Sequence, residues 1–261
     1  MAESSLRIAR SSPGLVWRAF DGAEAAGSVT ALLRPDDRWY VWFGSCRTDS
    51  YPPLLTAVAA NTGGRLHARV DEDDTETLAM LAGLGFVVDR RESNFLIPAD
   101  QLAGGWNVPE VPDGFVLISA GDADEDDLRL LDDALRQDVP GTDGWAWDPG
   151  DFREETYDSP SFDPAMYLVA VDTESGRYAG LTRIWNDPGQ PRLGLVAVLR
   201  PHRRRGLARA MLTRTLRAAH ARGGSEVTAE VDDTNAASAA LLRSLGARRT
   251  HGSLELIWRP G

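Results

Sequence analysis

The chain has 261 residues, 43% of them hydrophobic, and a formal net charge of −11. This composition excludes a disordered chain and is typical of a globular protein with a substantial apolar core. The acidic balance argues against a nucleic-acid partner, whose phosphates need a basic surface, and no apolar run approaches the roughly 20 residues of a membrane helix. The start has no signal-peptide core and the single cysteine, Cys46, cannot form an internal disulfide, so we expect a cytoplasmic protein without a membrane partner.

Predicted strands and helices alternate in the first part of the chain. Apolar and β-branched runs between turn residues predict strands over 14–20, 26–33, 38–45, 65–70 and 93–98. Residues 52–61 are predicted to form a helix with proline in its first turn, and a second helical pattern ends at Gly85. Residues 99–113 contain Gly-Gly, two prolines and no periodic pattern, which indicates a linker.

A second unit of the same kind follows the linker. Residues 124–139 predict an acidic amphipathic helix, and 140–164 a loop rich in Trp, Pro and Asp. Strands are predicted over 114–122, 166–172, 177–185, 192–199 and 254–260, with two helices and a further strand before the last of them. We therefore expect an α/β fold with mixed sheets flanked by helices, in two domains over 1–101 and 113–261 with a linker over 102–112.

The two halves of the sequence repeat. Residues 67–86 (HARVDEDDTETLAMLAGLGF) align without a gap with residues 228–247 (TAEVDDTNAASAALLRSLGA). Each segment is predicted to form a strand, an acidic turn, a helix that ends in Leu-Gly, and the start of a last strand. This agreement favours duplication of one unit over a chance similarity.

The stretch HRRRGLARAML, residues 202–212, joins an apolar strand to an amphipathic helix. The N–H groups of the turn would open a helix N-terminus, which suits an anion such as phosphate. Gly206 would let a ligand approach the backbone, and Ala208 is small enough for the same purpose. A Walker loop needs a lysine, which the chain lacks, and a G-x-G-x-x-G fingerprint is absent here. The alternative is a solvated basic turn that binds nothing.

The context of this turn resembles the GCN5-related N-acetyltransferase (GNAT) family over most of residues 113–261. The shared features are R-x-x-G-x-A after a V-x-V strand, then a helix, a strand ending in V-D-D-x-N, and a helix ending in Leu-Gly. The resemblance implies tandem GNAT-like domains and acetyl-coenzyme A (acetyl-CoA) as co-substrate. It implies as cofactor-binding residues Val196, Ala197, Val198, Arg203, Arg204, Arg205, Gly206, Leu207, Ala208, Arg209 and Asn235. Asn235 could equally be the N-cap of the following helix.

The first half resembles the same fold in degenerate form. Its strand is followed by RTDSYPP instead of an arginine-glycine turn. Pro52 and Pro53 have no N–H groups to offer an anion, and Asp49 would repel phosphate. We expect this half to bind no coenzyme A and to serve as a scaffold or as a wall of the acceptor site.

The catalytic groups are harder to assign. Acetyl transfer needs a neutral amine and therefore a base or a desolvating pocket, and Glu230 is the candidate base. The family resemblance implies a carbonyl-polarising N–H near Val198 and a tyrosine acid one residue beyond Leu241, where this chain has Leu242. A thiol pKa of about 8.5 makes an acid only modestly useful. No Cys/His cluster indicates a metal site.

The acceptor is expected to contact the loop over 140–164. Acidic residues interleaved with tryptophans suit a cationic amine, and the candidate residues are Asp143, Trp145, Trp147, Asp148 and Glu155. The leading hypothesis is an N-acetyltransferase, monomeric or homodimeric, that acts on a small cationic amine. The alternatives are a protein N-terminal or lysine acetyltransferase and a non-catalytic acyl-coenzyme A-binding regulatory protein.

Overall fold

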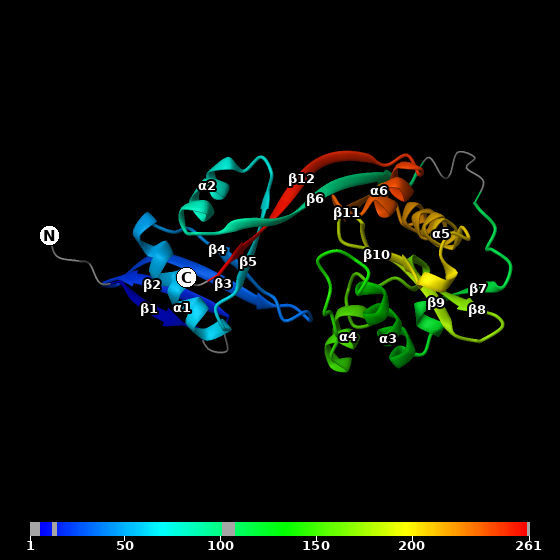
Figure 1. Ribbon diagram of the computed structural model, residues 1–261, viewed down its shortest axis with the longest axis horizontal. Coiled ribbons are helices and arrows are strands. Elements are labelled where there is room, and N and C mark those ends of the chain that lie inside the picture. The colour runs from blue at the N-terminus through cyan, green and yellow to red at the C-terminus, as the bar shows by residue number, and fades with distance from the viewer. Residues whose placement is uncertain (1–5, 12–14, 101–107, 260–261) are drawn as a thin grey trace. The chain divides into compact units, whose positions relative to one another are not determined.

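The computed structural model describes residues 6–11, 15–100 and 108–259, which form two compact units (Figure 1). Unit 1 comprises Met1–Glu92 and Gly252–Gly261, and unit 2 comprises Ser93–His251. This division differs from the predicted one because strands β6 (Val87–Pro98) and β12 (Arg248–Trp258) each begin in one unit and end in the other. Most of the linker expected over 102–112 lies outside the described residues.

Unit 1 has the strand order β1-β2-β3-β4-β5-β12. All its neighbouring strands are antiparallel except β4 and β5, which are parallel. Two helices, α1 (Tyr51–Thr62) and α2 (Thr75–Gly83), complete the unit. Its remaining strands are β1 (Arg7–Arg10), β2 (Val16–Asp21), β3 (Glu24–Leu33), β4 (Trp39–Phe43) and β5 (Leu66–Asp71).

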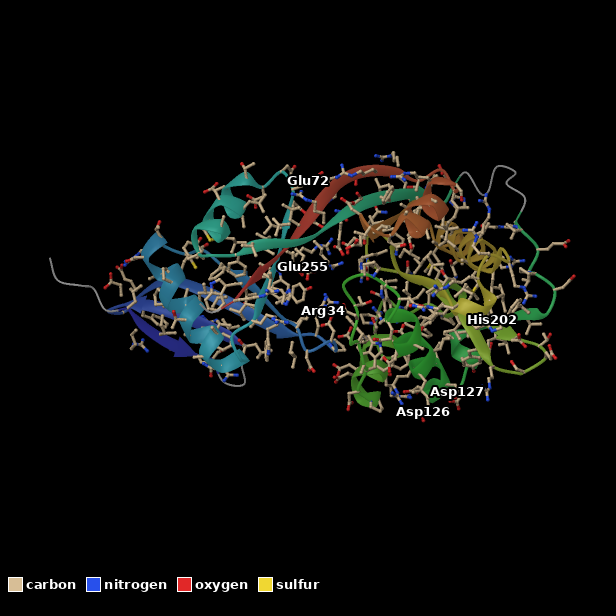
Figure 2. The ribbon with its side chains drawn as sticks, in the orientation of Figure 1. Arg34, Glu72, Asp126, Asp127, His202 and Glu255 are labelled. Carbon is tan, nitrogen blue, oxygen red and sulfur yellow. The ribbon has the colours of Figure 1, made fainter. Side chains whose placement is uncertain are left out.

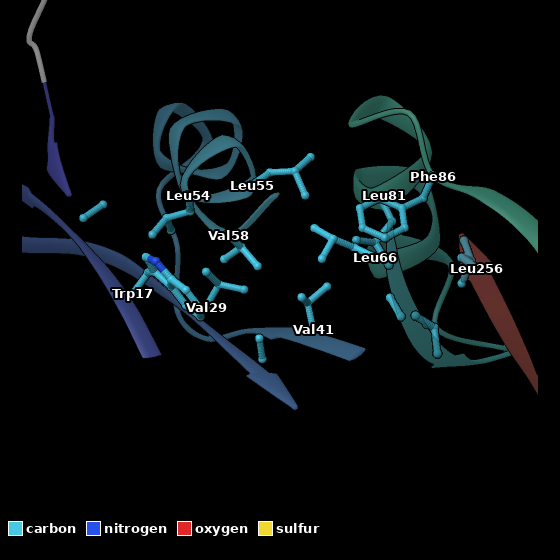
Figure 3. Close-up of a cluster of buried hydrophobic side chains, with 14 of the residues drawn as sticks. Trp17, Val29, Val41, Leu54, Leu55, Val58, Leu66, Leu81, Phe86 and Leu256 are labelled. Atoms are coloured by element: carbon cyan, nitrogen blue, oxygen red, sulfur yellow. The ribbon is translucent and has the colours of Figure 1, made fainter. Parts of the chain in front are cut away.

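The core of unit 1 lies between the sheet and these two helices (Figure 3). Leu54 and Val58 of α1 and Leu81 of α2 are almost fully buried, against Val29 and Val41 from the sheet. Burial of each such side chain contributes roughly 1.5–3 kcal/mol. Alternate residues of β3 and β4 therefore point to the helices, as the period of two in a strand requires.

Unit 2 has the strand order β6-β11-β10-β9-β8-β7. Its pairs are antiparallel from β7 through β10, and β10 and β11 are parallel. The order and directions of these strands match those of unit 1, with β6 in the place of β12. The strands are β7 (Phe115–Ser119), β8 (Tyr167–Asp172), β9 (Tyr178–Trp185), β10 (Arg192–Val198) and β11 (Glu226–Asp232).

Helices cover both faces of the unit 2 sheet. Apolar residues of α5 (Leu207–Ala221) and α6 (Ala236–Arg243) pack on one face, against side chains such as Ile184 and Val227. Those of α3 (Glu125–Arg136) and α4 (Pro149–Thr156) pack on the other face, against Leu181 and Leu195. The second of these faces is called the α3 face below.

The repeat predicted from the sequence is confirmed in detail. Asp74 accepts a hydrogen bond from the N–H of Thr77 at the start of α2, and Asn235 accepts one from Ser238 at the start of α6. Both helices end before a left-handed glycine, at Gly85 and Gly246. Two αβ units thus carry matching capping residues at matching positions, as duplication requires.

The fold class predicted from the sequence is confirmed, and three local features were not foreseen. The stretch over 140–164, expected to be a loop, contains α4, whose signals were Asp148 as N-cap and Pro149 in the first turn. β6 begins at Val87, six residues before the predicted strand, and β1 was missed altogether. Both have exposed charged residues, which hide the apolar pattern of a strand. No helix among the described residues is long and apolar enough to span a membrane.

Candidate active site in unit 2

The two central parallel strands of unit 2 separate from one another. β10 and β11 share a single register pair, Arg192 with Thr228, although each strand is seven residues long. The ladder between β10 and β9 is interrupted by a bulge between Leu193 and Leu195, and bulges bend the strand that carries them. A gap therefore opens between the carboxyl ends of β10 and β11.

The backbone of β10 presents polar groups to this gap. The N–H of Leu199 bonds to the carbonyl of Ala179, on the β9 side. Because successive N–H groups alternate between the two edges of a strand, those of Val196 and Val198 point toward the gap, and that of Ala197 points toward β9. Of the three strand residues predicted to bind the cofactor, Val196 and Val198 are therefore the two whose N–H groups can bond to a ligand in the gap.

The turn after β10 opens the N-terminus of α5. Gly206 is the N-cap, with φ +87°, and Arg204 also has a positive φ of +65°. No side chain caps this helix, and a Cβ at Gly206 would have no atom within 4 Å. The first N–H groups of α5 therefore have no side-chain cap, and together with the helix dipole they form a candidate anion site.

The side chain of Arg203 holds this turn against the strand. Its Nε donates to the carbonyl of Val198 at 2.7 Å, and its Nη2 donates to Asp138 at 2.6 Å. Hydrogen bonds from Arg200 and Arg203 lower the pKa of Asp138 to about 2, so the carboxylate stays ionised. Arg203 thus positions the turn, a role that its match to the family motif did not reveal.

Two more arginines of the turn are bound to protein groups. Arg205 donates to the carbonyl of Asp113 at 2.9 Å, and Arg209 donates to the hydroxyl of Ser244 at 2.8 Å. In the part of the chain that the structure describes, Arg204 is the arginine of this turn without a side-chain hydrogen bond or ion pair. The backbone therefore carries the anion site, and Arg204 is the side chain left to supplement it.

A pocket of about 420 Å³ in unit 2 is lined by residues of β6, β11 and β12. Val227, Ala229 and Val231 point into the core under α5 and α6, so the alternate residues Thr228 and Glu230 point the other way. Glu230 is exposed and lines the pocket. The whole lining is Asn94, Phe95, Leu96, Thr228, Glu230, Thr250 and His251.

The pocket also contains a histidine that the sequence did not single out. The hydroxyl of Thr250 donates to the carbonyl of Asn94 at 3.2 Å and lies 3.1 Å from Nδ1 of His251. Because the hydroxyl has one hydrogen, Nδ1 is the donor in the second contact, which leaves Nε2 as an acceptor in the neutral ring. His251 was missed because it comes from β12, beyond the segment that carries the motif.

The predicted tryptophans contact a cation that belongs to unit 2 itself. The guanidinium carbon of Arg136 lies 4.1 Å from the ring centre of Trp145 and 5.9 Å from that of Trp147. The indole N–H of Trp147 donates to the buried Asp132 at 2.9 Å. The sequence did not predict Arg136 as the partner, because its position on α3 gives no sign of this contact.

The acidic candidates of the same segment have different surroundings. Asp148 is the N-cap of α4 and accepts a hydrogen bond from the N–H of Gly150 at 2.8 Å. Asp143 and Glu155 are exposed. Asp148 is therefore committed to capping α4, whereas Asp143 and Glu155 are known only as exposed carboxylates.

Two further expectations concern α6. Leu242, at the family's tyrosine position, is 1% exposed and belongs to the core under α5 and α6. It therefore offers no proton. Asn235 accepts the hydrogen bond from Ser238 described above, so the N-cap interpretation is confirmed.

The corresponding turn of unit 1 has no comparable anion site. A short 3₁₀ turn, Thr48–Ser50, runs directly into α1, and the N-cap Ser50 has a right-handed φ of −88°. Pro52 and Pro53 remove two N–H groups from the first turn of the helix. Asp49, which would repel an anion, accepts hydrogen bonds from Arg47.

Unit 1 instead holds a buried cluster of polar and charged groups around Glu255, the residue labelled in Figure 2. Nδ1 of His67 lies 3.3 Å from Oε1 of Glu255, and Arg90 donates two hydrogen bonds to Oε2 at 2.9 and 2.7 Å. Burial alone would raise the pKa of Glu255, but these partners outweigh it and lower the pKa to about 2. His67, Asp89 and Glu255 have potential metal-ligating atoms within 4.8 Å of one another. Any metal ion there would compete with Arg90 for the carboxylate of Glu255.

Comparison with known proteins assigns the class of unit 2. Residues 130–247 match the model of the acetyltransferase (GNAT) family. Over these residues, unit 2 is therefore similar to a GNAT acetyltransferase domain, and such a domain supports acyl-coenzyme A-dependent acetyl transfer in general. A comparison with curated proteins gave no match.

Solved structures share the fold of the whole chain. A GCN5-related N-acetyltransferase from Sphaerobacter thermophilus is 21% identical with a TM-score of 0.69, over 95% of this chain and 82% of that one. A tandem GNAT protein from the clavulanic acid biosynthesis pathway is 16% identical with a TM-score of 0.70, over 94% and 82%. A GCN5-related N-acetyltransferase from Kribbella flavida is 17% identical with a TM-score of 0.59, over 98% and 90%. The tandem arrangement predicted from the sequence is thus confirmed.

The anion site of unit 2 fits the co-substrate of this class. The helix N-terminus without a side-chain cap, the left-handed Gly206 and the open space at its Cβ position suit a pyrophosphate group. The unpaired edge of β10, at Val196 and Val198, suits an extended amide chain that continues the hydrogen bonding of a strand. Both features lie at the carboxyl end of β10, where this strand separates from β11.

Proposed function

We propose that unit 2 transfers an acetyl group from acetyl-CoA to the amine of a small acceptor, and that unit 1 binds no coenzyme A. One observation carries the proposal: the helix N-terminus at Gly206 lacks a side-chain cap and follows a strand whose edge has separated from its neighbour. A long phosphorylated thioester needs both sites: a helix N-terminus for its phosphates and a strand edge for its extended amide chain. Acetyl-CoA, when bound, supplies an acyl group activated as a thioester.

The residues of the turn bind the co-substrate through their backbone. The N–H groups of Arg204 to Arg209 hold the pyrophosphate, with Gly206 providing access and the side chain of Arg204 adding positive charge. The edge of β10 at Val196 and Val198 binds the pantetheine arm. The N–H of Val198, which points into the gap, donates a hydrogen bond to the acyl carbonyl oxygen as negative charge develops there.

Glu230 removes the proton of the acceptor amine. It is exposed, lines the pocket and follows the gap on β11. A free alkylamine has a pKa of about 10.4 and is protonated at neutral pH, so a carboxylate within reach promotes the neutral, nucleophilic form. His251, with Nε2 as an acceptor, is a second candidate base in the same pocket. Leu242 cannot supply an acid, so the thiolate leaves without a proton from this position.

A small acceptor suits the dimensions of the site. The pocket of about 420 Å³ lies in the range of roughly 300–1,000 Å³ that is usual for small-molecule sites. The exposed Asp143 and Glu155, with the net charge of −11, would favour the approach of a cationic amine. An acceptor presented by a protein chain would need an open groove instead.

Two measurements test the proposal. Calorimetry with acetyl-CoA is expected to give saturable binding with one site per chain, and the absence of binding would overturn the proposal. Thiol release from acetyl-CoA is then measured with a panel of small amines and of peptides with free N-termini. Release above hydrolysis with small amines supports it; release with peptides alone supports a protein acetyltransferase, and release with neither supports a binding protein.

A further inference from the structure

A histidine in unit 1 is buried without a hydrogen bond. His67 of β5 is 3% exposed, and neither of its ring nitrogens has a hydrogen-bond partner among the described residues. The ring of Tyr40 stacks on it, with 5.4 Å between the two ring centres. A neutral imidazole has one donor and one acceptor nitrogen, and buried polar groups nearly always have partners. The environment of His67 therefore requires an explanation.

Nδ1 of His67 faces a carboxylate oxygen that also lacks a hydrogen bond. It lies 3.3 Å from Oε1 of Glu255, a residue that is 2% exposed. The two atoms are not aligned as donor and acceptor, and in the described part of the chain Oε1 has no hydrogen-bond partner. In a tetrahedral zinc site, ligand atoms about 2.0–2.2 Å from the ion are about 3.4 Å from one another. The spacing of Nδ1 and Oε1 is therefore that of two ligands of one ion.

The register of the strands brings a third ligand residue to the same place. The residues on either side of His67 in β5, and of Glu255 in β12, belong to the core under α1 and α2, so both side chains point to the opposite face of the sheet. Ile257 of β12 pairs with His67, so Glu255, two residues earlier, is a diagonal neighbour of His67 on that face. Asp89 lies on β6, the next strand after β12 in the sheet, and completes the group whose potential ligand atoms lie within 4.8 Å of one another.

Arg90 binds the other oxygen of the Glu255 carboxylate. Its two hydrogen bonds, at 2.9 and 2.7 Å, both go to Oε2, which leaves Oε1 for an ion. An outer hydrogen-bond donor of this kind is usual for a carboxylate that binds a metal. Glu92 pairs with Arg90 at 2.8 Å and with Arg69 at 3.3 Å. With Asp89, three carboxylates thus accompany two guanidinium groups, and the excess of negative charge offsets the competition from Arg90 and attracts a cation.

We infer that His67, Glu255 and Asp89 bind a divalent transition-metal ion such as Zn²⁺, through Nδ1, Oε1 and a carboxylate oxygen of Asp89. One imidazole nitrogen and two carboxylate oxygens suit Zn²⁺, whereas Mg²⁺ and Ca²⁺ prefer oxygen ligands alone. Asp89 is exposed, so the ion enters from its side of the group. Bound there, the ion joins β12, the last strand of the chain, to β5 and β6 and stabilises unit 1.

This inference is independent of acetyl transfer in unit 2, because neither acetyl-CoA nor the acceptor contributes to it. The sequence indicated no metal site, since its residues come from three strands that are far apart in the chain. The site therefore depends on the place of β12 in unit 1.

Calorimetry with Zn²⁺ tests the inference. The full chain is freed of metal with a chelator, dialysed and titrated with Zn²⁺ and, for comparison, with Mg²⁺. The variants are His67→Asn and Asp89→Asn, and the matched controls are His220→Asn on α5 and Asp71→Asn, an exposed acid of β5. The wild type and both controls are expected to bind Zn²⁺ saturably and far more tightly than Mg²⁺. Each ligand variant is expected to bind Zn²⁺ about 100-fold or more weakly, since even outer-shell partners contribute about 10–100-fold.

Thermal unfolding distinguishes loss of the ion from loss of the fold. At a hundredfold excess over its Kd, Zn²⁺ is expected to raise the melting temperature of the wild type by about 5 °C or more, and that of Asp89→Asn much less. Because Asp89 is exposed, Asp89→Asn is expected to melt like the metal-free wild type. This variant therefore tests the site even if His67→Asn does not fold.

NMR spectra of the imidazole rings locate the bound ion. Zn²⁺ is expected to shift the ring signals of His67, assigned with the His67 variant or by sequential assignment, and to leave those of His220 in place. Absence of saturable Zn²⁺ binding by the wild type would overturn the inference. So would equal affinity for Mg²⁺, which would exclude the imidazole ligand, or an unchanged Zn²⁺ affinity in Asp89→Asn.

Discussion

Units 1 and 2 have the same strand order, and each contains one of the two matching capped helices, α2 and α6. They differ in two segments that matter for chemistry. In unit 2, α3 and α4 lie between Ser119, the end of β7, and Tyr167, the start of β8. In unit 1, β1 ends at Arg10 and β2 begins at Val16, so the corresponding connection is far shorter. Unit 1 therefore lacks the segment that in unit 2 covers the α3 face.

The second difference is the turn into the helix that follows the fourth strand of each unit. In unit 2 this turn ends in a left-handed glycine and leaves the helix N-terminus open. In unit 1 it is a 3₁₀ turn followed by two prolines. The duplicated fold thus keeps its packing in both copies, whereas the backbone groups proposed to bind an anion occur in one. Packing depends on spaced apolar residues, but an anion site depends on a few backbone N–H groups that a proline removes.

The largest expected effect concerns the turn itself. Gly206→Glu is expected to weaken acetyl-CoA binding by about 1,000-fold or more, because its carboxylate would occupy the site of several charge-assisted hydrogen bonds of about 1.5–3 kcal/mol each. Calorimetry measures the affinity and the stoichiometry.

Gly223→Glu is the matched control. Gly223 has φ +97°, follows the other end of α5 and likewise has no atom within 4 Å of a Cβ, so it imposes the same backbone strain of about 1–2 kcal/mol. Thr48→Glu, in the corresponding turn of unit 1, is also expected to leave the affinity unchanged. A second acetyl-CoA site per chain would contradict the proposed difference between the units. So would an equal loss of affinity in Gly206→Glu, Gly223→Glu and Thr48→Glu.

The next effect concerns the base. Glu230→Gln is expected to lower kcat by about 100-fold or more and to leave the affinity for acetyl-CoA unchanged, since the side chain lies in the acceptor pocket. In the repeat, Arg69 of unit 1 corresponds to Glu230, and Arg69→Gln is expected to leave kcat unchanged. Steady-state kinetics of both variants and of His251→Gln checks this. If His251→Gln shows the large loss and Glu230→Gln does not, His251 is the base.

A smaller effect tests whether position 242 belongs to the apolar core or to the active site. Leu242→Tyr and Leu81→Tyr place the same group at matching positions of the two units, where the leucines are 1% and 2% exposed. Each is expected to cost about 1–3 kcal/mol through overpacking, as measured by urea unfolding. Neither should raise kcat. A rise in kcat for Leu242→Tyr would mean that the new hydroxyl reaches the leaving thiolate, contrary to the buried position of Leu242.

The smallest effect concerns the helix caps. Asn235→Ala is expected to destabilise α6 by about 1 kcal/mol at any pH. The cap of α2 behaves differently, because the backbone hydrogen bond from Thr77 lowers the pKa of Asp74. A lowered folded pKa gives stability that is present above the unfolded pKa of about 3.9 and is lost as the pH falls through the folded value.

Hydrogen exchange of the two helices checks this difference. Asp74→Ala is expected to increase exchange in α2 at neutral pH and to have less effect at pH of about 3, below the ordinary aspartate pKa. The effect of Asn235→Ala on α6 should not change over this range. The same pH response in both helices would contradict the assignment of the caps.

The sequence alone determined the fold class, the repeat and the turn at Gly206. These features depend on local signals: apolar periodicity, capping residues such as Asn235, and a glycine where the chain must take a left-handed conformation. The capping signal of α4, Asp148 followed by Pro149, was also present in the sequence and could have been used. A stretch rich in turn residues concealed it.

Only the tertiary structure decided which side chains meet. The exchange of β6 and β12 between the units brings Asn94 and His251 into one pocket with Glu230, although these residues are far apart in the chain. Likewise, the sequence gives no sign that His67 lies beside Glu255 or that Arg136 stacks on Trp145. Such pairings depend on the register of neighbouring strands and on the packing of a helix across them, which local propensity does not specify.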